Sequence, residues 1–295
     1  MDHPDYNSPT ELKSFLEANG MAMQKKFGQN FMISPDARKK IVGAMQLEEG
    51  MHVWEIGPGL GSITELMLEE KAFVTTFEID RGFISFLHQF FSDYEQSNHF
   101  TLVEGDVLKT WNQTYKNQAA QYKVSRLTGN LPYNIAATFI AETITSNVIF
   151  DKCVFTVQKE VADRMAARPS TDAYSAFSVL CQWAYDVHTI LMLPPGNFWP
   201  RPNVASAAVV FEKRSEPYHC SDPSFFVKVV HALFSSRRKT IHNNLRMIIP
   251  PELDDTALCE QAHLSPSARA EDLTIKQLIE LSETVSSAIL ELAQK

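Results

Sequence analysis

A short motif, Asn130-Leu131-Pro132-Tyr133, combines residue types that can position an aromatic amine. It follows an apolar run over residues 124–129, which is typical of a buried strand. The Asn130 side-chain oxygen and the Leu131 carbonyl are both acceptors, and Pro132 fixes the backbone so that they can face one point. Tyr133 supplies a flat apolar face for stacking. The motif suits methylation of an exocyclic amine, although such peptides also occur in ordinary turns.

The chemistry that this motif suits needs no strong general base. The lone pair of an exocyclic amine is delocalised into the adenine ring. Two acceptors that hold the amine hydrogens favour a pyramidal nitrogen, whose lone pair can then be directed at a methyl group. Positioning and electrostatics can therefore lower the barrier, and the proton can leave afterwards.

A glycine-rich loop, EIGPGLG over residues 55–61, follows the first expected strand. Gly57 and Gly59 allow a tight turn and the close approach of a ligand. The spacing is GxGxG instead of the dinucleotide GxGxxG, and the loop lacks the Lys and Ser/Thr of a P-loop. Glu78 and Asp106 end two further strands, where they can bind ribose hydroxyls and an adenine amino group. Together these features favour S-adenosylmethionine over NAD, and a purely structural turn is the alternative.

The elements that must position these residues follow an alternating pattern. Short apolar runs separated by longer helical stretches predict βαβ units and a mostly parallel sheet, which is an α/β fold. A run over 206–213 predicts a last strand, at an edge or antiparallel. The proline-rich link over 194–202 predicts a stiff loop that is long enough to line a site. The other expected strands lie within 51–57, 72–79, 100–106, 124–130 and 153–158.

The strand pattern stops after Lys213, which predicts two domains. Residues 1–213 form the expected S-adenosylmethionine-binding methyltransferase domain, with an N-terminal extension over 1–24. Residues 214–295 form the expected helical RNA-binding domain. Helix starts are expected at Ser221-Asp222-Pro223 and at Thr274, where Gln277 completes a capping box.

The net charge of −8 argues against a nucleic-acid partner, but the charge is unevenly spread. Residues 20–46 hold five basic residues against Asp36, and residues 196–246 hold eight against three acidic ones. Either these segments bind phosphates or they are solvated faces. Arg237-Arg238-Lys239 is expected near a helix end, pointing outward. Helix capping is the alternative role for this cluster, and RNA binding would then move to Lys25, Lys26 and the run over 38–40.

Four cysteines without a CxxC pair argue against a zinc module or a disulfide framework and favour free thiols in a reducing cytoplasm. No metal site is expected. The sequence shows neither a signal peptide nor an apolar run long enough for a membrane span. A cytoplasmic protein is therefore expected.

These motifs, together with others, resemble those of the ribosomal RNA adenine dimethyltransferases of the bacterial small-subunit (KsgA) type. The resemblance runs from about Lys25 to Glu283. Its further motifs are Lys26-Phe27-Gly28-Gln29-Asn30-Phe31, Gln158-Lys159-Glu160-Val161, Phe198 within PPGNFWPRP, Arg237-Arg238-Lys239-Thr240 and Arg269-Ala270-Glu271-Asp272-Leu273. Ser34 and Met32 replace the usual Asp and Leu, and Trp54 stands where a smaller residue is common.

The resemblance implies a Rossmann-like S-adenosylmethionine-dependent sheet and a set of site residues. Tyr133 and Phe198 should sandwich the target adenine. Cofactor contacts are implied for Asn30, Met32, Gly57, Glu78, Asp106 and Asn130, with Gln29 and Gly59 nearby.

The activity that the resemblance implies is dimethylation of N6 on two adjacent adenosines near the 3′ end of small-subunit (16S) rRNA. The implied partner is this rRNA within a subunit or an assembly intermediate, and the implied state is a monomer with a role in subunit biogenesis. One alternative is a large-subunit methyltransferase of the antibiotic-resistance type, although Leu131 and the segment 237–240 favour the small-subunit type. Another is an assembly checkpoint factor for which methylation is secondary.

Overall fold

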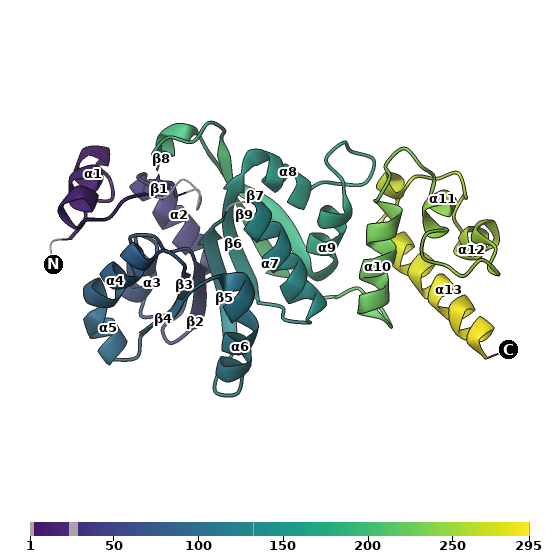
Figure 1. Ribbon diagram of the computed structural model, residues 1–295, viewed down its shortest axis with the longest axis horizontal. Coiled ribbons are helices and arrows are strands. Elements are labelled where there is room, and N and C mark those ends of the chain that lie inside the picture. Colours follow the sequence, from purple (N-terminus) through teal and green to yellow (C-terminus); the bar gives the residue numbers. More distant parts are fainter. Residues whose placement is uncertain (1–2, 24–28, 132, 295) are drawn as a thin grey trace. The chain divides into compact units, whose positions relative to one another are not determined.

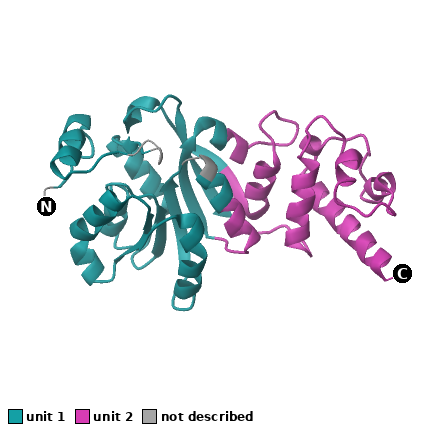
Figure 2. Ribbon diagram, in the orientation of Figure 1, with its two compact units in different colours: residues 1–139, 150–162, 188–213 teal, residues 140–149, 163–187, 214–295 magenta. Residues whose placement is uncertain are grey.

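The computed structural model describes residues 3–23, 29–131 and 133–294; the side chains of Tyr133 and Asn134 lie outside the description. The chain divides into two compact units, which Figure 2 colours separately. Unit 1 comprises residues 1–139, 150–162 and 188–213, and unit 2 comprises residues 140–149, 163–187 and 214–295. Among the described residues, no helix combines the length and the apolar character needed to cross a membrane.

Unit 1 is built on a seven-stranded sheet with the order β4-β3-β2-β5-β6-β9-β7 (Figure 1). The five strands from β4 to β6 are parallel, and β9 runs antiparallel to β6. The predicted α/β fold and its mostly parallel sheet are therefore confirmed. The strands are β2 (His52–Ile56), β3 (Phe73–Glu78), β4 (Phe100–Glu104), β5 (Val124–Asn130), β6 (Lys152–Gln158), β7 (Tyr185–Leu193) and β9 (Ser206–Lys213).

Helices flank this sheet and begin where the sequence places caps. The Ser34 hydroxyl accepts from the Ala37 amide at 3.3 Å and starts α2 (Pro35–Met45), so serine serves as the cap at this position. The other helices along the sheet are α3 (Thr64–Glu69), α4 (Arg81–Phe90), α5 (Ser92–Gln96), α6 (Val107–Ala119), α7 (Tyr133–Thr145) and α8 (Lys159–Met165).

The structure decides one expectation about the last strands and corrects another. Of the two alternatives for the strand over 206–213, the structure shows the antiparallel one, and the strand is not at an edge because β7 lies beyond it. The link over 194–202 is not a loop throughout. It contains a 3₁₀ turn, η2 (Pro195–Asn197), and a short strand, β8 (Phe198–Trp199), which pairs with β1 (Phe31–Met32). Two-residue strands are too short to show a period in the sequence.

Trp54, at a position where the resemblance implies a smaller residue, lies in the interior of unit 1. It is fully buried, and its indole N–H donates to Gln118 at 2.7 Å. The Gln118 amide in turn donates to Thr75 at 2.9 Å. The large ring thus adds apolar burial without leaving its polar atom unpaired.

Unit 2 is helical, and its helices are α9 (Ala176–Ala184), α10 (Pro223–Leu233), α11 (Ile241–Leu245), α12 (Asp255–Gln261) and α13 (Ile275–Ala293). Asp222 caps α10, and the capping box of Thr274 and Gln277 starts α13, as predicted. The expected boundary after residue 213 agrees with one segment of this unit. The unit also takes residues 140–149 and 163–187, because α9 packs onto α10 through Trp183 and Phe226, whose ring centroids are 5.0 Å apart.

Candidate active site

A pocket of about 530 Å³ lies in unit 1, where β2, β3 and β5 end. Ligands of open α/β sheets bind at this edge, beyond the carboxyl ends of the strands. The pocket brings together nine residues that the sequence nominated, from segments far apart in the chain. They are Gln29, Asn30, Met32, Gly57, Gly59, Glu78, Asp106, Asn130 and Leu131.

The glycine loop turns at the end of β2 through positive φ angles, which are 69° at Gly57 and 59° at Gly59. A side chain at either position would be strained, because L-residues rarely adopt this conformation. A Cβ at Gly59 would also lie 3.3 Å from the Phe31 ring, which lines the same pocket. The Gly57 amide donates to the Phe77 carbonyl at 2.9 Å and ties the loop to β3.

Glu78 at the end of β3 is held in one orientation by three backbone amides. Its Oε1 accepts from Ile79 and Asp80 at 2.8 Å each, and its Oε2 accepts from Gly59 at 3.3 Å. Burial raises the pKa of Glu78, and the three amides oppose that shift because they favour the ionised form. The carboxylate is a fixed acceptor at the pocket wall, which suits hydroxyl groups of a ligand.

Glu55 lines the pocket too, although the sequence analysis did not place it among the site residues. The signal for it was its position at the start of the glycine loop, two residues before Gly57. It is buried, and the Thr64 hydroxyl donates to it at 2.5 Å. Burial raises its pKa to about 7, opposed by the Thr64 bond and reinforced by the negative charge of Glu78.

Asp106 both caps a helix and lines the pocket. Its Oδ1 accepts from the Leu108 amide at 3.1 Å at the start of α6. Gln29, on another part of the wall, donates to the Asp80 carboxylate at 2.9 Å. The described lining contains Glu55, Glu78 and Asp106 but no Lys, Arg or His. Such a lining disfavours a pyrophosphate and fits a nucleoside with a cationic centre, such as the sulfonium of S-adenosylmethionine.

Asn130 lies at the end of β5, and its side-chain nitrogen donates to the Asn30 carbonyl at 3.0 Å. The Leu131 amide donates to the Thr156 carbonyl at 2.9 Å, which anchors the backbone of the motif to β6. With its nitrogen used in this way, the Asn130 amide has its oxygen left as an acceptor. Pro132 and the side chain of Tyr133 lie outside the described residues.

Phe198, the expected second stacking face, is not among the residues that line this pocket. It is only 3% exposed and packs in the core of unit 1, with its backbone paired to Met32. Its neighbour Trp199 stacks on Phe31 at a centroid distance of 6.2 Å. Phe198 is thus a buried core residue next to the pocket-lining Met32, through a β1–β8 pairing that the sequence did not reveal.

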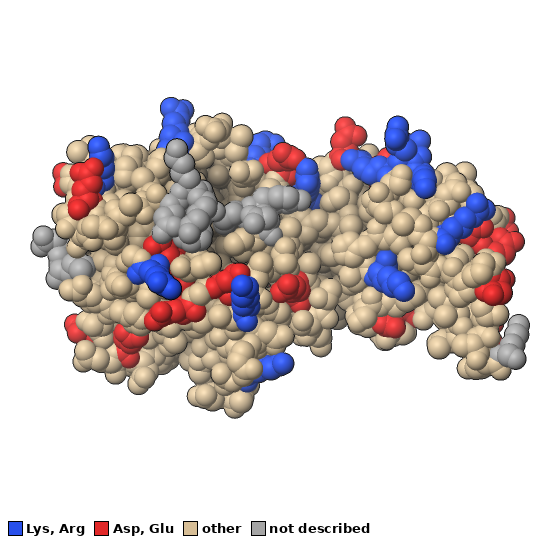
Figure 3. Space-filling model, viewed as in Figure 1, with Lys and Arg blue, Asp and Glu red and all other residues tan. Residues whose placement is uncertain are grey.

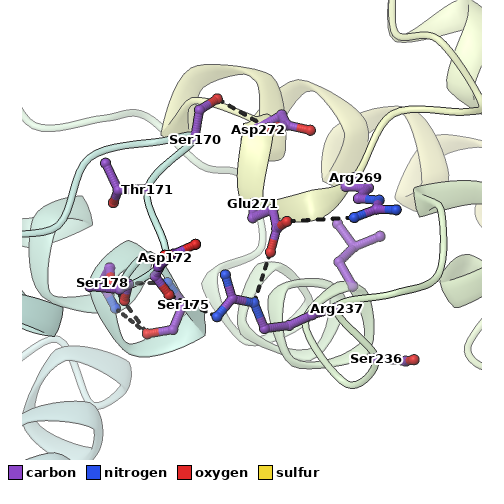
Figure 4. A network of polar contacts seen from close by, with 12 residues as sticks. Ser170, Thr171, Asp172, Ser175, Ser178, Ser236, Arg237, Arg269, Glu271 and Asp272 are labelled. Atoms are coloured by element: carbon purple, nitrogen blue, oxygen red, sulfur yellow. Dashed lines mark hydrogen bonds and ion pairs between the residues drawn. The ribbon is translucent and has the colours of Figure 1, made fainter.

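The basic residues nominated for RNA binding divide into three groups. Lys25 and Lys26 lie outside the described residues. Arg237 is in the turn between α10 and α11, where it donates to Glu271 at 2.8 Å and to the Asp172 carbonyl at 2.7 Å (Figure 4). Arg238 and Lys239 are exposed in the same turn, and the described residues give them no ion pair.

Lys and Arg side chains group together on one part of unit 2. Figure 3 shows this group along the upper edge of the unit, with Asp and Glu side chains beside it and at the far end of the unit. Glu271 pairs with Arg237 and also lies 4.0 Å from Arg269 (Figure 4). The loop before α9 joins the same network, since the Ser170 amide donates to the Glu271 carbonyl at 2.7 Å. Arg237 is therefore partly neutralised by its own protein, whereas Arg238 and Lys239 face solvent.

Comparisons with known proteins agree with this geometry. The family described as ribosomal RNA adenine dimethylase matches residues 20–287. The chain is 46% identical to ribosomal RNA small subunit methyltransferase A of Treponema denticola, over 96% of both chains. It is 36% identical to the protein of the same name from Lactococcus lactis, over 92% of this chain and 93% of the other.

Two solved structures share the fold. A dimethyladenosine transferase from Plasmodium falciparum superimposes with a TM-score of 0.70 at 24% identity, over 88% of this chain and 96% of that one. The 23S rRNA methyltransferase ErmE gives a TM-score of 0.61 at 19% identity, over 86% and 98%. Both likenesses establish the S-adenosylmethionine-dependent methyltransferase fold. The match over nearly the whole chain, with two relatives well above 30% identity, shows that this chain belongs to the ribosomal RNA adenine dimethylase family.

Proposed function

We propose that this chain transfers methyl groups from S-adenosylmethionine to N6 of two adjacent adenosines near the 3′ end of small-subunit rRNA. The single observation that carries the proposal is the hydrogen bond from Asn130 to the Asn30 carbonyl, at a wall of the acid-lined pocket. The relatives from Treponema denticola and Lactococcus lactis are small-subunit rRNA methyltransferases by name, which supports this substrate over large-subunit rRNA.

Different pocket residues bind different parts of the cofactor. Glu78 accepts the ribose hydroxyls, Asp106 faces the adenine, and the glycine loop lets the chain pass close to the nucleoside. When bound, S-adenosylmethionine supplies an electrophilic methyl group on a cationic sulfur. Glu78, whose three backbone amide partners favour its ionised form, gives this region a negative charge that favours the cation.

The motif at the end of β5 positions the amine. Asn130 Oδ1 and the Leu131 carbonyl each accept one amine hydrogen, so the nitrogen lone pair turns out of the ring plane toward the methyl group. After the first transfer one hydrogen is left, and the same acceptors can hold it for the second. Orientation of this kind stabilises the transition state without a base. Each of the two transfers leaves the nitrogen with one proton too many, which departs to solvent, and the cofactor departs as the thioether S-adenosylhomocysteine.

Two aromatic faces, Tyr133 and Phe198, are proposed to hold the flipped adenine between them. Because Phe198 is buried, its ring has to become accessible when RNA binds. RNA phosphates are proposed to contact Lys25, Lys26, Arg238 and Lys239, with Arg237 anchoring the turn. We further propose that residues 1–213 carry the chemistry and residues 214–295 most of the RNA contacts, in a cytoplasmic monomer that contributes to subunit biogenesis.

An assembly role without chemistry is the second candidate, supported by the exposed basic turn in unit 2. The experiment that separates the two compares a strain lacking the protein with one carrying Asn130→Ala. If the variant restores subunit maturation without methylated rRNA, binding is the main role. If it behaves like the deletion, the chemistry matters most.

A further inference from the structure

An N-terminal arm, residues 3–19, lies ahead of the family match and packs against the core of unit 1. It carries helix α1 (Pro9–Ala18), which Ser8 caps. Leu12 and Leu16 of this helix are buried among the hydrophobic residues of that core. The arm is therefore an integral part of unit 1. It also makes two polar contacts with segments that form the pocket.

The first contact reaches the glycine loop. The Tyr6 hydroxyl donates to the Leu60 carbonyl at 2.9 Å, in the turn that the Gly61 amide closes onto the Pro58 carbonyl. Tyr6 is 7% exposed, so water does not compete for this bond. Burial raises the pKa of Tyr6 well above its usual value, which keeps the hydroxyl protonated and able to donate.

The second contact reaches another part of the pocket lining, Met32, through Arg38 of α2. One guanidinium nitrogen donates to the Met32 carbonyl and another donates to the Asn7 side chain, both at 2.6 Å. The guanidinium also lies 5.6 Å from the centre of the Tyr6 ring. Arg38 is 6% exposed, so the arm encloses a buried charge whose other bond fixes a pocket-lining residue.

We infer that the N-terminal arm is a positioning element for the cofactor pocket, in which Tyr6 holds the glycine loop and Asn7 holds the Met32 wall through Arg38. This inference rests on the proposed binding of S-adenosylmethionine in that pocket. The arm touches none of the pocket itself, since none of its residues lines the cavity as described. Its effect is to hold the loop in its binding conformation before the ligand arrives, which lowers the entropy that binding must remove.

The test compares two tyrosines that make the same kind of bond. Tyr6→Phe removes one hydroxyl and keeps the ring beside Arg38. Tyr174→Phe is the matched control, because the Tyr174 hydroxyl also donates to a backbone carbonyl, that of Leu273 at 3.1 Å, and the residue is fully buried in unit 2. Both variants lose one buried hydrogen bond of comparable strength.

Calorimetric titration with S-adenosylmethionine, well below the unfolding temperature of each protein, gives the readout. The dissociation constant of Tyr6→Phe should rise about threefold to tenfold, which corresponds to one lost hydrogen bond. That of Tyr174→Phe should equal the wild-type value. In steady-state assays KM for S-adenosylmethionine should rise for Tyr6→Phe with little change in kcat, because the arm acts on binding and not on the amine.

A second variant keeps the inference testable if Tyr6→Phe does not fold. Asn7 is exposed, so Asn7→Ala removes the Arg38 partner without opening the core, and it should weaken binding by about twofold to threefold. Wild-type affinity in both arm variants would overturn the inference, as would equal weakening in Tyr6→Phe and Tyr174→Phe. A wild-type protein that binds no S-adenosylmethionine would instead overturn the proposed function.

Discussion

Asn130 donates a hydrogen bond from its side-chain nitrogen to the backbone carbonyl of Asn30, a hundred residues earlier in the chain, at 3.0 Å. The bond joins the end of β5 to the segment before β1, and both residues line the same pocket. It determines which end of the amide remains as an acceptor. The orientation of the Asn130 side chain therefore depends on two segments of the pocket lining, the end of β5 and the segment before β1.

Replacing Asn130 should remove methyl transfer. In Asn130→Ala one of two acceptors is lost, and the single-turnover rate should fall by ~10²–10³. Because Asn130 is exposed, circular dichroism should show an intact fold. Asn130→Asp separates orientation from acceptor number, since its carboxylate cannot donate to the Asn30 carbonyl and should also be slow. A wild-type rate in Asn130→Asp would make the bond to Asn30 dispensable.

Glu78 should act on cofactor affinity and not on the transfer step. Glu78→Gln keeps the size of the side chain but removes the ionised acceptor, so the dissociation constant for S-adenosylmethionine should rise by about tenfold or more. Glu104→Gln is the control, because Glu104 pairs in register with Glu78 at the end of β4 but is exposed and outside the pocket. Equal affinities in the two variants would reduce Glu78 to a structural acceptor of backbone amides.

Glu55 makes the stability of unit 1 depend on pH. Its pKa of about 7 in the folded protein lies above the ordinary value near 4.5, so between these values the folded state binds a proton that the unfolded state does not. Stability is accordingly lost as pH rises through this window. Glu55→Gln removes the effect and should gain stability relative to wild type from pH 5 to pH 8, by on the order of 3 kcal/mol at most.

Denaturant unfolding of both proteins at several pH values measures this difference. Glu78 and the other titrating groups are present in both proteins, so their effects largely cancel. Parallel curves of unfolding free energy against pH would show that Glu55 is ionised in the folded protein throughout and that the pocket is more hydrated than its burial implies.

The basic turn should contribute to RNA affinity through Arg238 and Lys239. Replacing both by Ala should make the slope of log affinity against log salt shallower by about two units, as expected for two lost phosphate contacts. Cofactor affinity should not change. Lys228→Ala, at an exposed site on α10, is the control and should leave the slope unchanged.

A variant at Arg237 tests whether this residue stabilises the turn and makes no phosphate contact of its own. Adding Arg237→Ala to the double variant breaks its bonds to Glu271 and Asp172, so it should lower thermal stability while the salt slope stays that of the double variant. A further loss of one unit in slope would assign a phosphate contact to Arg237 as well. Parallel lines for the wild type and the double variant would move the RNA surface away from this turn.

Phe198 should have a structural role that can be separated from stacking. Phe198→Leu keeps most of the buried volume and should cost about 1–2 kcal/mol of stability. Phe211→Leu, at a fully buried position of β9, is the matched core control. If Phe198 stacks on the adenine, its variant alone should lose about tenfold in turnover, in line with stacking energies in RNA recognition. Equal turnover in the two variants would confine Phe198 to the core.

The sequence predicted the elements whose signals are local. The parallel strands, the helix starts at Asp222 and Thr274 and the turn at the glycine loop all follow from nearby residues. Strand β7 was missed because it is largely exposed and has no clean alternation. The assignment of 163–187 to unit 2 depends on α9 packing against a helix far along the chain, which no local pattern reports.

The site likewise contains residues that local sequence signals predict and features that depend on tertiary packing. Gly57, Glu78, Asp106 and Asn130 end strands or begin loops, so their convergence follows from the topology of a parallel sheet. The burial of Phe198, the Arg237–Glu271 pair and the raised pKa of Glu55 arise from tertiary packing. The sequence therefore could not show which of the nominated residues line the pocket and which are buried or paired within the protein.

The most direct test of the proposed function is to incubate the purified protein with S-adenosylmethionine and small ribosomal subunits that lack the modification, then map the methylated nucleosides by mass spectrometry. The expected result is N6,N6-dimethyladenosine at two adjacent positions near the 3′ end of the small-subunit rRNA, absent with Asn130→Ala. Methylation confined to large-subunit rRNA, or no methylated adenosine at all, would contradict it.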